Sequence, residues 1–268
     1  MGDDYLLGMS DDELARLGFQ HQMWAVPTAA LWDRAGFARG HRILDLGAGP
    51  GFASIDLARR VGPPGSIVAI DASDKAIATL QARARTEGLE IDARVDDVSS
   101  CALGSDFDGV FARWIFCFLP NAREVAHRVA AAVKPGGCVA ILDYFHYGAL
   151  ALAPKVEVFP KLVDAVQASW RANGGSLDVA GSLPTWLEEA GLRVDRIEPI
   201  VHAARPGDPM WHWPMTFFAT YLDVLVQLGH LEPDDADAVR RAFDERAANP
   251  QSFILTPPVL SIVARRPA

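Results

Sequence analysis

One short segment combines three glycines and a carboxylate in a pattern typical of a nucleotide-like binding loop. Residues 43–54 read Ile-Leu-Asp-Leu-Gly-Ala-Gly-Pro-Gly-Phe-Ala-Ser, so an apolar strand that contains Asp45 leads through Gly47, Gly49 and Gly51 into a predicted helix. Glycines adopt turn conformations that other residues resist, and they leave no Cβ between the backbone and a ligand. The segment therefore predicts a cofactor site.

The glycine spacing and the neighbouring charge indicate which cofactor binds. A dinucleotide fingerprint is G-x-G-x-x-G and holds a pyrophosphate. This chain has G-x-G-x-G instead, with Phe52 where the third glycine of that fingerprint would stand. Asp45 would repel a pyrophosphate and attract a cation. The loop thus disfavours an NAD-dependent dehydrogenase and favours S-adenosylmethionine, which carries a sulfonium and an ammonium charge.

Two further acidic positions follow predicted strands. Asp71 ends the apolar segment 67–71. In a doubly wound sheet it lies beside the glycine loop, where its carboxylate can accept hydrogen bonds from both ribose hydroxyls. The alternative is that Asp71 only caps the next helix. Asp96 and Asp97 follow the third strand, and we expect Asp97 to accept from an adenine amino group while Val98 packs on the ring. Either acid could instead be the solvated one.

The elements that must position these residues alternate between strand-like and helix-like patterns. The predicted ranges are 42–46, 52–60, 66–71, 74–87, 90–95, 107–112, 122–133 and 139–144. This alternation predicts an α/β fold with a doubly wound parallel sheet and helices on both faces. Before it, Ser10 and Glu13 form a capping box that predicts a helix from about residue 11. Within it, Lys134-Pro135-Gly136-Gly137 predicts a turn.

The alternation breaks after residue 145. We expect helices at 151–170, 183–190 and 234–247, a loop rich in Pro and Trp at 206–214, a strongly apolar segment at 216–228, and strands at 192–200 and 259–264. The predicted organisation is an N-terminal helical arm over the cofactor (1–40) and one domain (41–268). Helical cap segments are expected near 147–182 and 205–250.

The composition of the chain argues against several classes of function and site. The chain of 268 residues has 34 acidic and 25 basic residues, and a formal net charge of −9. No basic run suggests nucleic-acid binding. We expect no metal site, because the three cysteines are far apart, and no membrane association, because no signal peptide or long apolar run is evident. A cytoplasmic protein is expected, and an apolar surface on the added helices would allow a homodimer.

Six sequence blocks, in order, resemble the class I S-adenosylmethionine-dependent methyltransferases, a broad group that includes ubiquinone and menaquinone biosynthesis methyltransferases and many small-molecule methyltransferases. The blocks are Leu44–Gly51, Ile70–Asp71, Asp97, Phe107–Val110, Leu119–Pro120 and Lys134–Gly137. The resemblance implies a Rossmann-like seven-stranded sheet of order 3-2-1-4-5-7-6, with the last strand antiparallel. It also implies that Gly47 and Gly49 lie against the methionine part of the cofactor, Asp71 at the ribose and Asp97 at the adenine.

Residues of the N-terminal arm complete the predicted cofactor site. The resemblance implies that Tyr5 and Gln20 lie near the cofactor, although a helix face packed on the sheet explains them equally well. The full predicted cofactor set is Tyr5, Gln20, Asp45, Gly47, Gly49, Gly51, Asp71, Ala72, Asp97, Val98 and Arg113.

Methyl transfer is an in-line displacement, so the protein mainly aligns the acceptor and excludes water. A general base is needed only if the acceptor must lose a proton. His146, after the fifth strand, is the first candidate base and His212 the second. Arg113 would either anchor a substrate carboxylate or pair with Asp45 or another acid.

Aromatic residues near the strand ends and in the additions could form an apolar acceptor pocket. The predicted acceptor set is Trp114, Tyr144, Tyr147, Trp211, Trp213 and Phe217. Ordinary helix core explains much of 216–228 as well. The favoured function is methyl transfer to a small aromatic or apolar molecule. Alternatives are a protein of the same fold that uses the cofactor for decarboxylation, hydroxylation or cyclisation, and a pure binding module.

Overall fold

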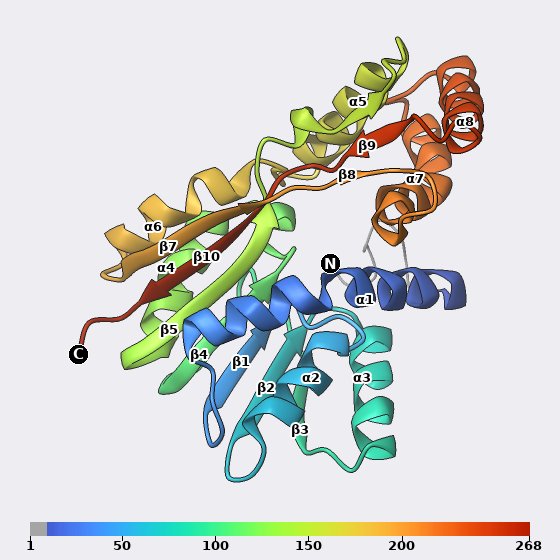
Figure 1. Cartoon of the computed structure of the whole chain (residues 1–268). Coiled ribbons are helices and arrows are strands. Elements are labelled where there is room, and N and C mark those ends of the chain that lie inside the picture. The colour runs from blue at the N-terminus through green and yellow to red at the C-terminus, as the bar shows by residue number, and fades with distance from the viewer. Residues whose placement is uncertain (1–9) are drawn as a thin grey trace.

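A seven-stranded sheet forms the centre of the computed structural model, which describes residues 10–268. Its order is β3-β2-β1-β4-β5-β10-β7, and β10 is antiparallel to both of its neighbours (Figure 1). The strands are β1 (Arg42–Leu46), β2 (Ser66–Asp71), β3 (Ile91–Val95), β4 (Phe107–Arg113), β5 (Val133–Tyr144), β7 (Arg193–Ile200) and β10 (Val259–Arg265). The predicted order is confirmed, since β7 and β10 are the sixth and seventh strands of this sheet along the chain.

Helices cover both faces of this sheet, because successive strand residues point to opposite sides. Ile43 and Phe111 belong to the core beneath α1, α2 and α3, whereas Leu44 and Val110 belong to the core beneath α4 and α6. The helices are α1 (Asp11–Ala35), α2 (Phe52–Val61), α3 (Asp74–Thr86), α4 (Ala122–Ala132), α5 (Phe159–Ala172), α6 (Leu183–Glu189), α7 (Pro209–Gln227) and α8 (Pro233–Ala247). Short 3₁₀ turns lie at Phe116–Phe118, Tyr147–Ala149 and Val179–Gly181.

A cap lies beyond the carboxyl ends of β4 and β5 and consists of α5, α7, α8 and a second sheet (Figure 1). This three-stranded sheet has the order β6-β9-β8 and was not predicted. Its strands are β6 (Ala151–Ala153), β8 (Ala203–Ala204) and β9 (Phe253–Leu255). The helix expected over 151–170 is therefore wrong at its start. Pro154 cannot continue a helix, whereas Pro160 is tolerated in the first turn of α5.

Two other predicted loops are parts of regular elements. Only residues 206–208 of the segment 206–214 form a turn, because α7 begins at Pro209, where a missing N–H costs nothing. Lys134–Gly137 belongs to β5 rather than to a separate turn. Its backbone pairs with the chain end, since Gly136 N donates to Arg266 O (3.0 Å) and Arg266 N donates to Gly137 O (2.9 Å).

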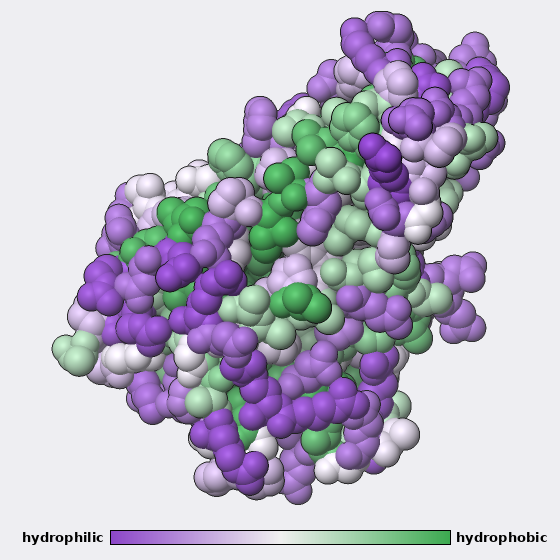
Figure 2. All heavy atoms as spheres, viewed as in Figure 1, coloured by the Kyte–Doolittle hydropathy of each residue, from purple (hydrophilic) through white to green (hydrophobic). Residues whose placement is uncertain are grey.

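The predicted start of α1 is confirmed, with Ser10 as its N-cap. The Ser10 hydroxyl oxygen accepts a hydrogen bond from Glu13 N (3.1 Å), and the helix ends at Gly36, whose φ is 76°. Over residues 10–268, none of the helices combines the length and apolar character needed to cross a bilayer. In Figure 2 the lower part of the molecule is mostly hydrophilic, and apolar atoms gather where β8 and β9 run between the main sheet and the cap.

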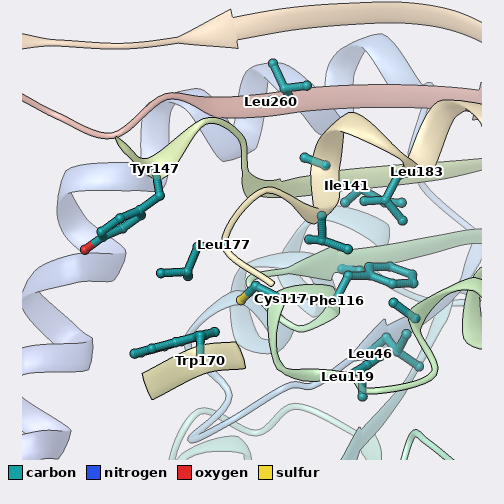
Figure 3. Packing of buried hydrophobic residues seen from close by; sticks show 14 of the residues in the cluster. Leu46, Phe116, Cys117, Leu119, Ile141, Tyr147, Trp170, Leu177, Leu183 and Leu260 are labelled. Atoms are coloured by element: carbon teal, nitrogen blue, oxygen red, sulfur yellow. The ribbon is translucent and has the colours of Figure 1, made fainter. Parts of the chain in front are cut away.

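The core continues from the main sheet into the cap without a break. Figure 3 shows Phe116, Ile141 and Leu183 at one end of the cluster, Tyr147 and Trp170 at the other, and Cys117 between them. The cap therefore packs as an extension of the sheet's hydrophobic core, and it holds its aromatic residues in fixed positions over the strand ends.

Candidate functional site

The glycine loop follows β1 and is held against the end of β2. Gly47 N and Ala48 N both donate to Ile70 O, at 2.9 and 3.0 Å. Gly47, Gly49 and Gly51 all have positive φ, at 69°, 54° and 81°. A Cβ at Gly51 would lie 2.1 Å from Leu80, whereas a Cβ at Gly49 would meet no heavy atom within 4 Å among the described residues. Open space beside Gly49 fits a ligand that lies against the backbone.

Asp71 joins the loop to the end of β2. Its carboxylate accepts from Gly49 N (2.8 Å, Oδ2) and from Ser73 N (2.9 Å, Oδ1). Burial raises the pKa of Asp71, and these two donors oppose the rise. Ser73 caps α3, because its side chain accepts from Ala76 N. Each oxygen of Asp71 keeps a second lone pair, so the carboxylate retains the capacity to accept ribose hydroxyls.

Asp45 is a buried carboxylate at the end of β1. Its side chain accepts from the Ser54 hydroxyl (2.5 Å), and the residue is only 2% exposed. Burial raises its pKa to about 6, while the Ser54 hydrogen bond and the charge of Arg113 oppose the rise. When it is ionised, this carboxylate needs a cation nearby.

Arg113, at the end of β4, is the nearby cation within the protein. Burial lowers its pKa to about 10, and Asp45 is the main opposing influence. Its guanidinium donates to Thr28 Oγ1 (3.1 Å) and lies 3.3 Å from His21 Nδ1, and His21 Nε2 lies 3.0 Å from Asp56 Oδ2. Arg113 therefore acts on Asp45 through its positive charge, which lowers the pKa of Asp45. The hydrogen-bond partners of Arg113 come from α1. Sequence reasoning missed these partners.

The predicted adenine residues follow β3. Asp97 is exposed, and its Oδ1 accepts from Ser99 N (2.8 Å). Asp96 N donates to Asp71 O (3.0 Å), which ties this segment to the ribose-side carboxylate. Val98 is only 4% exposed and packs in the core. Ala72, after β2, is exposed. The structure brings these residues to the same sheet edge as the glycine loop, and their roles stay predictions.

The N-terminal arm contributes through α1. Tyr5 lies outside the described residues. Gln20 Oε1 accepts from Trp213 Nε1 (3.1 Å) and from the Arg16 guanidinium (3.2 Å), and Arg16 also pairs with buried Glu13. Gln20 therefore links α1 to α7 of the cap.

Four aromatic residues from four elements meet next to the glycine loop, and we call them the aromatic cluster: Trp24, Trp114, Tyr144 and Trp213. Trp114 stacks on Trp213 (ring centroids 5.9 Å apart) and on Tyr144 (6.1 Å). Trp24, which sequence reasoning missed, packs edge-on against Trp114 (5.1 Å) and Trp213 (5.0 Å). Tyr147 packs edge-on against Tyr144 (5.4 Å).

The aromatic cluster reaches the glycine loop through Ile115. A Cβ on Gly47 would lie 2.8 Å from the Ile115 side chain, so this residue covers the loop directly after Trp114. The structure therefore places four of the six predicted acceptor residues in or against one cluster beside the predicted cofactor loop.

The other predicted acceptor residues and bases lie elsewhere. Trp211 is buried in the core on the side of α7 opposite Trp213, because residues two apart point to different sides of a helix. Phe217 stacks on Tyr221 (4.8 Å) inside the cap. His146 and His212 are both exposed. Their assignment as bases stays a prediction.

Asp143 is a second buried acid, and it is one of the polar residues at the end of the fifth predicted strand that the sequence offers as candidates for the cleft. It lies on β5, and its carboxylate accepts from Tyr144 N (2.8 Å) and Cys117 N (3.3 Å). Burial raises its pKa to about 7.

A cavity of about 750 Å³ lies apart from this site, near the N-terminus of α4 and the turn before α6. Its lining includes Asn121, His127, Ser176 and Trp186, and contains none of the predicted cofactor or acceptor residues. The candidate site is therefore defined by the loop, its carboxylates and the aromatic cluster.

Comparisons with known proteins point to one family. Residues 43–137 match the model of a methyltransferase domain. The chain is 28% identical over 187 residues to Methyltransferase GfsG of Streptomyces halstedii, an alignment that covers 68% of this chain and 63% of the relative. It is 29% identical over 171 residues to a trans-aconitate 2-methyltransferase of Methylobacterium nodulans, with 63% and 64% covered. The chain thus spans less than two thirds of either relative.

Solved structures share the fold over most of the chain. A protein described as a methyltransferase from Bacillus halodurans has a TM-score of 0.61 at 16% identity, with 90% of this chain and 99% of the other covered. The [4+2]-cyclase SpnF has a TM-score of 0.57 at 19% identity, with 90% and 80% covered. Together with the sheet order and the matched domain, these likenesses lead to one conclusion. Residues 43–137 form a methyltransferase domain, the chain has the fold of the class I S-adenosylmethionine-dependent methyltransferases, and both findings support S-adenosylmethionine as the cofactor.

Proposed function

We propose that this protein transfers a methyl group from S-adenosylmethionine to a small, uncharged aromatic or apolar molecule. The observation that carries the proposal is the position of the aromatic cluster, which Ile115 connects directly to Gly47 of the loop. An acceptor among these rings would be next to the cofactor.

The residues present suit the cofactor. Gly49 offers a backbone with open space beside it, Gly47 lies in the same turn beneath Ile115, Asp71 offers acceptors for the ribose, and buried Asp45 offers a negative charge. Bound there, S-adenosylmethionine supplies an electrophilic methyl group. Ala72, Asp97 and Val98 complete the proposed cofactor set at the adenine side, and Arg113 limits the electrostatic cost of ionised Asp45.

The acceptor side is built to exclude water and fix orientation. Trp24, Trp213 and Tyr144 are contributed by α1, α7 and β5, so the rings around Trp114 are held from three directions. Alignment of the acceptor and removal of water are the main demands of an in-line displacement. Planar side chains bind planar or apolar molecules through burial of apolar surface.

The runner-up is a non-methylating reaction that keeps the same cofactor. SpnF has this fold and is described as a [4+2]-cyclase, so the fold alone is compatible with both kinds of chemistry. The low identity to SpnF gives this alternative no support beyond the fold.

The test uses the full chain with S-adenosylmethionine that carries a labelled methyl group. The protein is incubated with uncharged phenols, flavonoid-like polyphenols and, for comparison, small tricarboxylates. Label transfer to the aromatic acceptors, and not to the tricarboxylates, is expected. Tight cofactor binding without transfer to any acceptor would overturn methylation, and transfer to tricarboxylates alone would overturn the proposed acceptor class.

A further inference from the structure

His21 of α1 connects two other elements of the cofactor site through its two ring nitrogens. Nδ1 lies 3.3 Å from the Arg113 guanidinium at the end of β4, and Nε2 lies 3.0 Å from Asp56 Oδ2 of α2. The side chain is only 13% exposed. It therefore joins the helix that follows the glycine loop to the strand beside that loop.

The two partners of His21 determine which ring nitrogen carries the proton. A guanidinium only donates hydrogen bonds, and an ionised carboxylate only accepts them. The hydrogen bond with His21 is the main influence that keeps the pKa of Asp56 below its usual range. Nδ1 must therefore accept from Arg113, while Nε2–H donates to Asp56, and the hydrogen bonds run in one direction from Arg113 through His21 to Asp56.

Phe52, the first residue of α2, fixes the plane of the His21 ring. The two rings stack with centroids 5.5 Å apart and an interplanar angle of 21°. Gly18, about one turn earlier in α1, leaves room for Phe52, since a Cβ there would lie 3.1 Å from the ring. The Arg83 guanidinium of α3 packs on Phe52 at 3.9 Å. These contacts hold the imidazole in one orientation.

Arg113 depends on α1 for its orientation. Within residues 10–268, its guanidinium bonds two side chains, Thr28 Oγ1 (3.1 Å) and His21 Nδ1, and both belong to α1. Thr28 is 1% exposed and lies about two turns after His21, so both side chains face the same way. An arginine side chain is long and flexible, with about 2 kcal/mol of rotamer entropy. The two acceptors on α1 therefore decide where its charge lies.

The charge of Arg113 lies next to Asp45. β1 and β4 are parallel neighbours, and their register pairs Asp45 with Phe111. Ile43 and Phe111 belong to the same core, and side chains alternate along a strand, so Asp45 and Arg113 point to that same face. Diagonal neighbours on one face lie within reach of a long side chain. Burial raises the pKa of Asp45 to about 6, and the Ser54 hydrogen bond and the Arg113 charge oppose the rise.

We propose that His21 is a positioning residue of the cofactor site. With its tautomer set by Asp56, it holds the Arg113 guanidinium beside Asp45, so that Asp45 stays ionised for the ammonium group of S-adenosylmethionine. His21 acts through Arg113 and does not touch the ligand. The inference rests on the cofactor site of the proposed function and is independent of the acceptor.

The charged groups around Asp45 and Arg113 come from several elements. Asp45 faces Arg113 of β4 and Asp71 of β2, and the charge of Asp71 raises the pKa of Asp45. Arg113 faces Asp45 and Asp56, and both favour its charged form. Arg59 of α2 pairs with Asp56 at 2.9 Å. Arg113 is the cation that acts on Asp45, so a change in its position should alter the ionisation of Asp45 directly.

The test measures the affinity of the full chain for S-adenosylhomocysteine by titration calorimetry between pH 5 and pH 8. His21→Phe keeps a ring that can stack on Phe52 but loses both hydrogen bonds. His21→Asn keeps an acceptor oxygen close to the place of Nδ1. His127→Phe is the matched control, because His127 also faces a carboxylate, that of Glu189 (3.7 Å), but lies on α4 outside the site.

We expect the affinity of the parent chain to rise with pH as Asp45 ionises, and His21→Phe to move the midpoint of this rise upward. A shift of about half a pH unit lowers the affinity below the midpoint about threefold and leaves the affinity at pH 8 within about twofold. His21→Asn should restore most of the midpoint, and His127→Phe should leave it in place. Adding Asp56→Ala to His21→Phe should shift the midpoint no further, because Asp56 acts through His21.

A purely structural role of His21 gives a different result, because poor packing of α1 would lower the affinity by the same factor at every pH. Such a uniform loss, an unchanged midpoint in His21→Phe, or an equal shift in His127→Phe would overturn the inference. A pH dependence that persists in Asp45→Asn would do the same.

Failure of the proposed function is distinguishable, because this measurement involves no methyl transfer. If the midpoints move as expected but no acceptor is methylated, the positioning role of His21 stands and the proposed function fails. Absence of S-adenosylhomocysteine binding at every pH would overturn both.

Discussion

Gln20 of α1 accepts a hydrogen bond from the indole of Trp213 of α7, with 3.1 Å between Oε1 and Nε1. The two residues are 193 positions apart in the chain, and their contact joins the N-terminal helix to the cap. It fixes one wall of the aromatic cluster, because Trp213 stacks on Trp114.

Gln20→Ala should lower the free energy of unfolding by about 1–3 kcal/mol, because it leaves a buried indole N–H without a partner. Chemical denaturation measures this change. Gln22→Ala, an exposed glutamine of the same helix, is the control and should have little effect. Binding of S-adenosylhomocysteine to the Gln20 variant separates this packing role from the cofactor role that the family resemblance implies. A large loss of affinity without loss of stability would contradict the packing role.

Asp71→Ala should weaken S-adenosylhomocysteine binding at least about tenfold, because a carboxylate that accepts ribose hydroxyls makes charge-assisted hydrogen bonds. The change also removes the hydrogen bond from Gly49 N to the Asp71 carboxylate, and this bond orders the glycine loop. Titration calorimetry measures the affinity. Asp74→Ala, which removes an exposed acid in the first turn of α3, is the control. Equal effects of the two variants would show that Asp71 has no specific role.

Cofactor affinity should rise with pH through the pKa of Asp45. Burial holds this pKa at about 6 in the free protein, so the carboxyl is largely protonated at pH 5. A cationic ligand favours the ionised form of Asp45. Below the pKa of Asp45, ligand binding must therefore release the proton of this carboxyl group. The affinity of S-adenosylhomocysteine, which keeps its ammonium group, should increase about tenfold between pH 5 and pH 7 and then level off.

Asp45→Asn should remove this pH dependence and bind weakly throughout. Asp143, whose pKa burial raises to about 7, is the other buried acid near the strand ends, so Asp143→Asn serves as the control and should keep the rise near pH 6. If the pH dependence survives in the Asp45 variant and disappears in the Asp143 variant, the assignment of Asp45 is wrong.

Gly51→Ala should destabilise the protein more than Gly36→Ala does. Both glycines have positive φ, at 81° and 76°, so each substitution carries a backbone cost of about 1–2 kcal/mol. Only at Gly51 does the added Cβ clash, 2.1 Å from Leu80, while at Gly36 no described heavy atom lies within 4 Å. The clash should add about 1–3 kcal/mol, measured by thermal unfolding. Equal destabilisation would mean that Leu80 moves away without cost.

Residues 42–145 show how much a sequence predicts when its signals are local. The glycine spacing, Asp45 and Asp71 predicted the loop and the cofactor, because each depends on a strand end and the turn that follows it. The order of the sheet came from the resemblance to the methyltransferases. In the same way, Ser10 and Glu13 predicted the start of α1.

The cap was harder to predict, since its elements are defined by distant partners. β6 and β8 both pair with β9, which comes from near the end of the chain, and such pairing leaves no local pattern. The prolines in 206–214 suggested a loop, although Pro209 begins a helix and Pro214 lies inside it.

The sequence by itself determined the fold class, the cofactor loop and the two carboxylates at its strand ends, because short-range backbone geometry requires those residue types. Only the tertiary structure decided which aromatic residues meet. It placed Trp114 and Trp213 together, directed Trp211 into the core and Phe217 against Tyr221 in the cap, and added Trp24. The physical reason is that the direction in which a helix side chain points depends on its position in the turn, and its neighbours depend on which elements pack across that face.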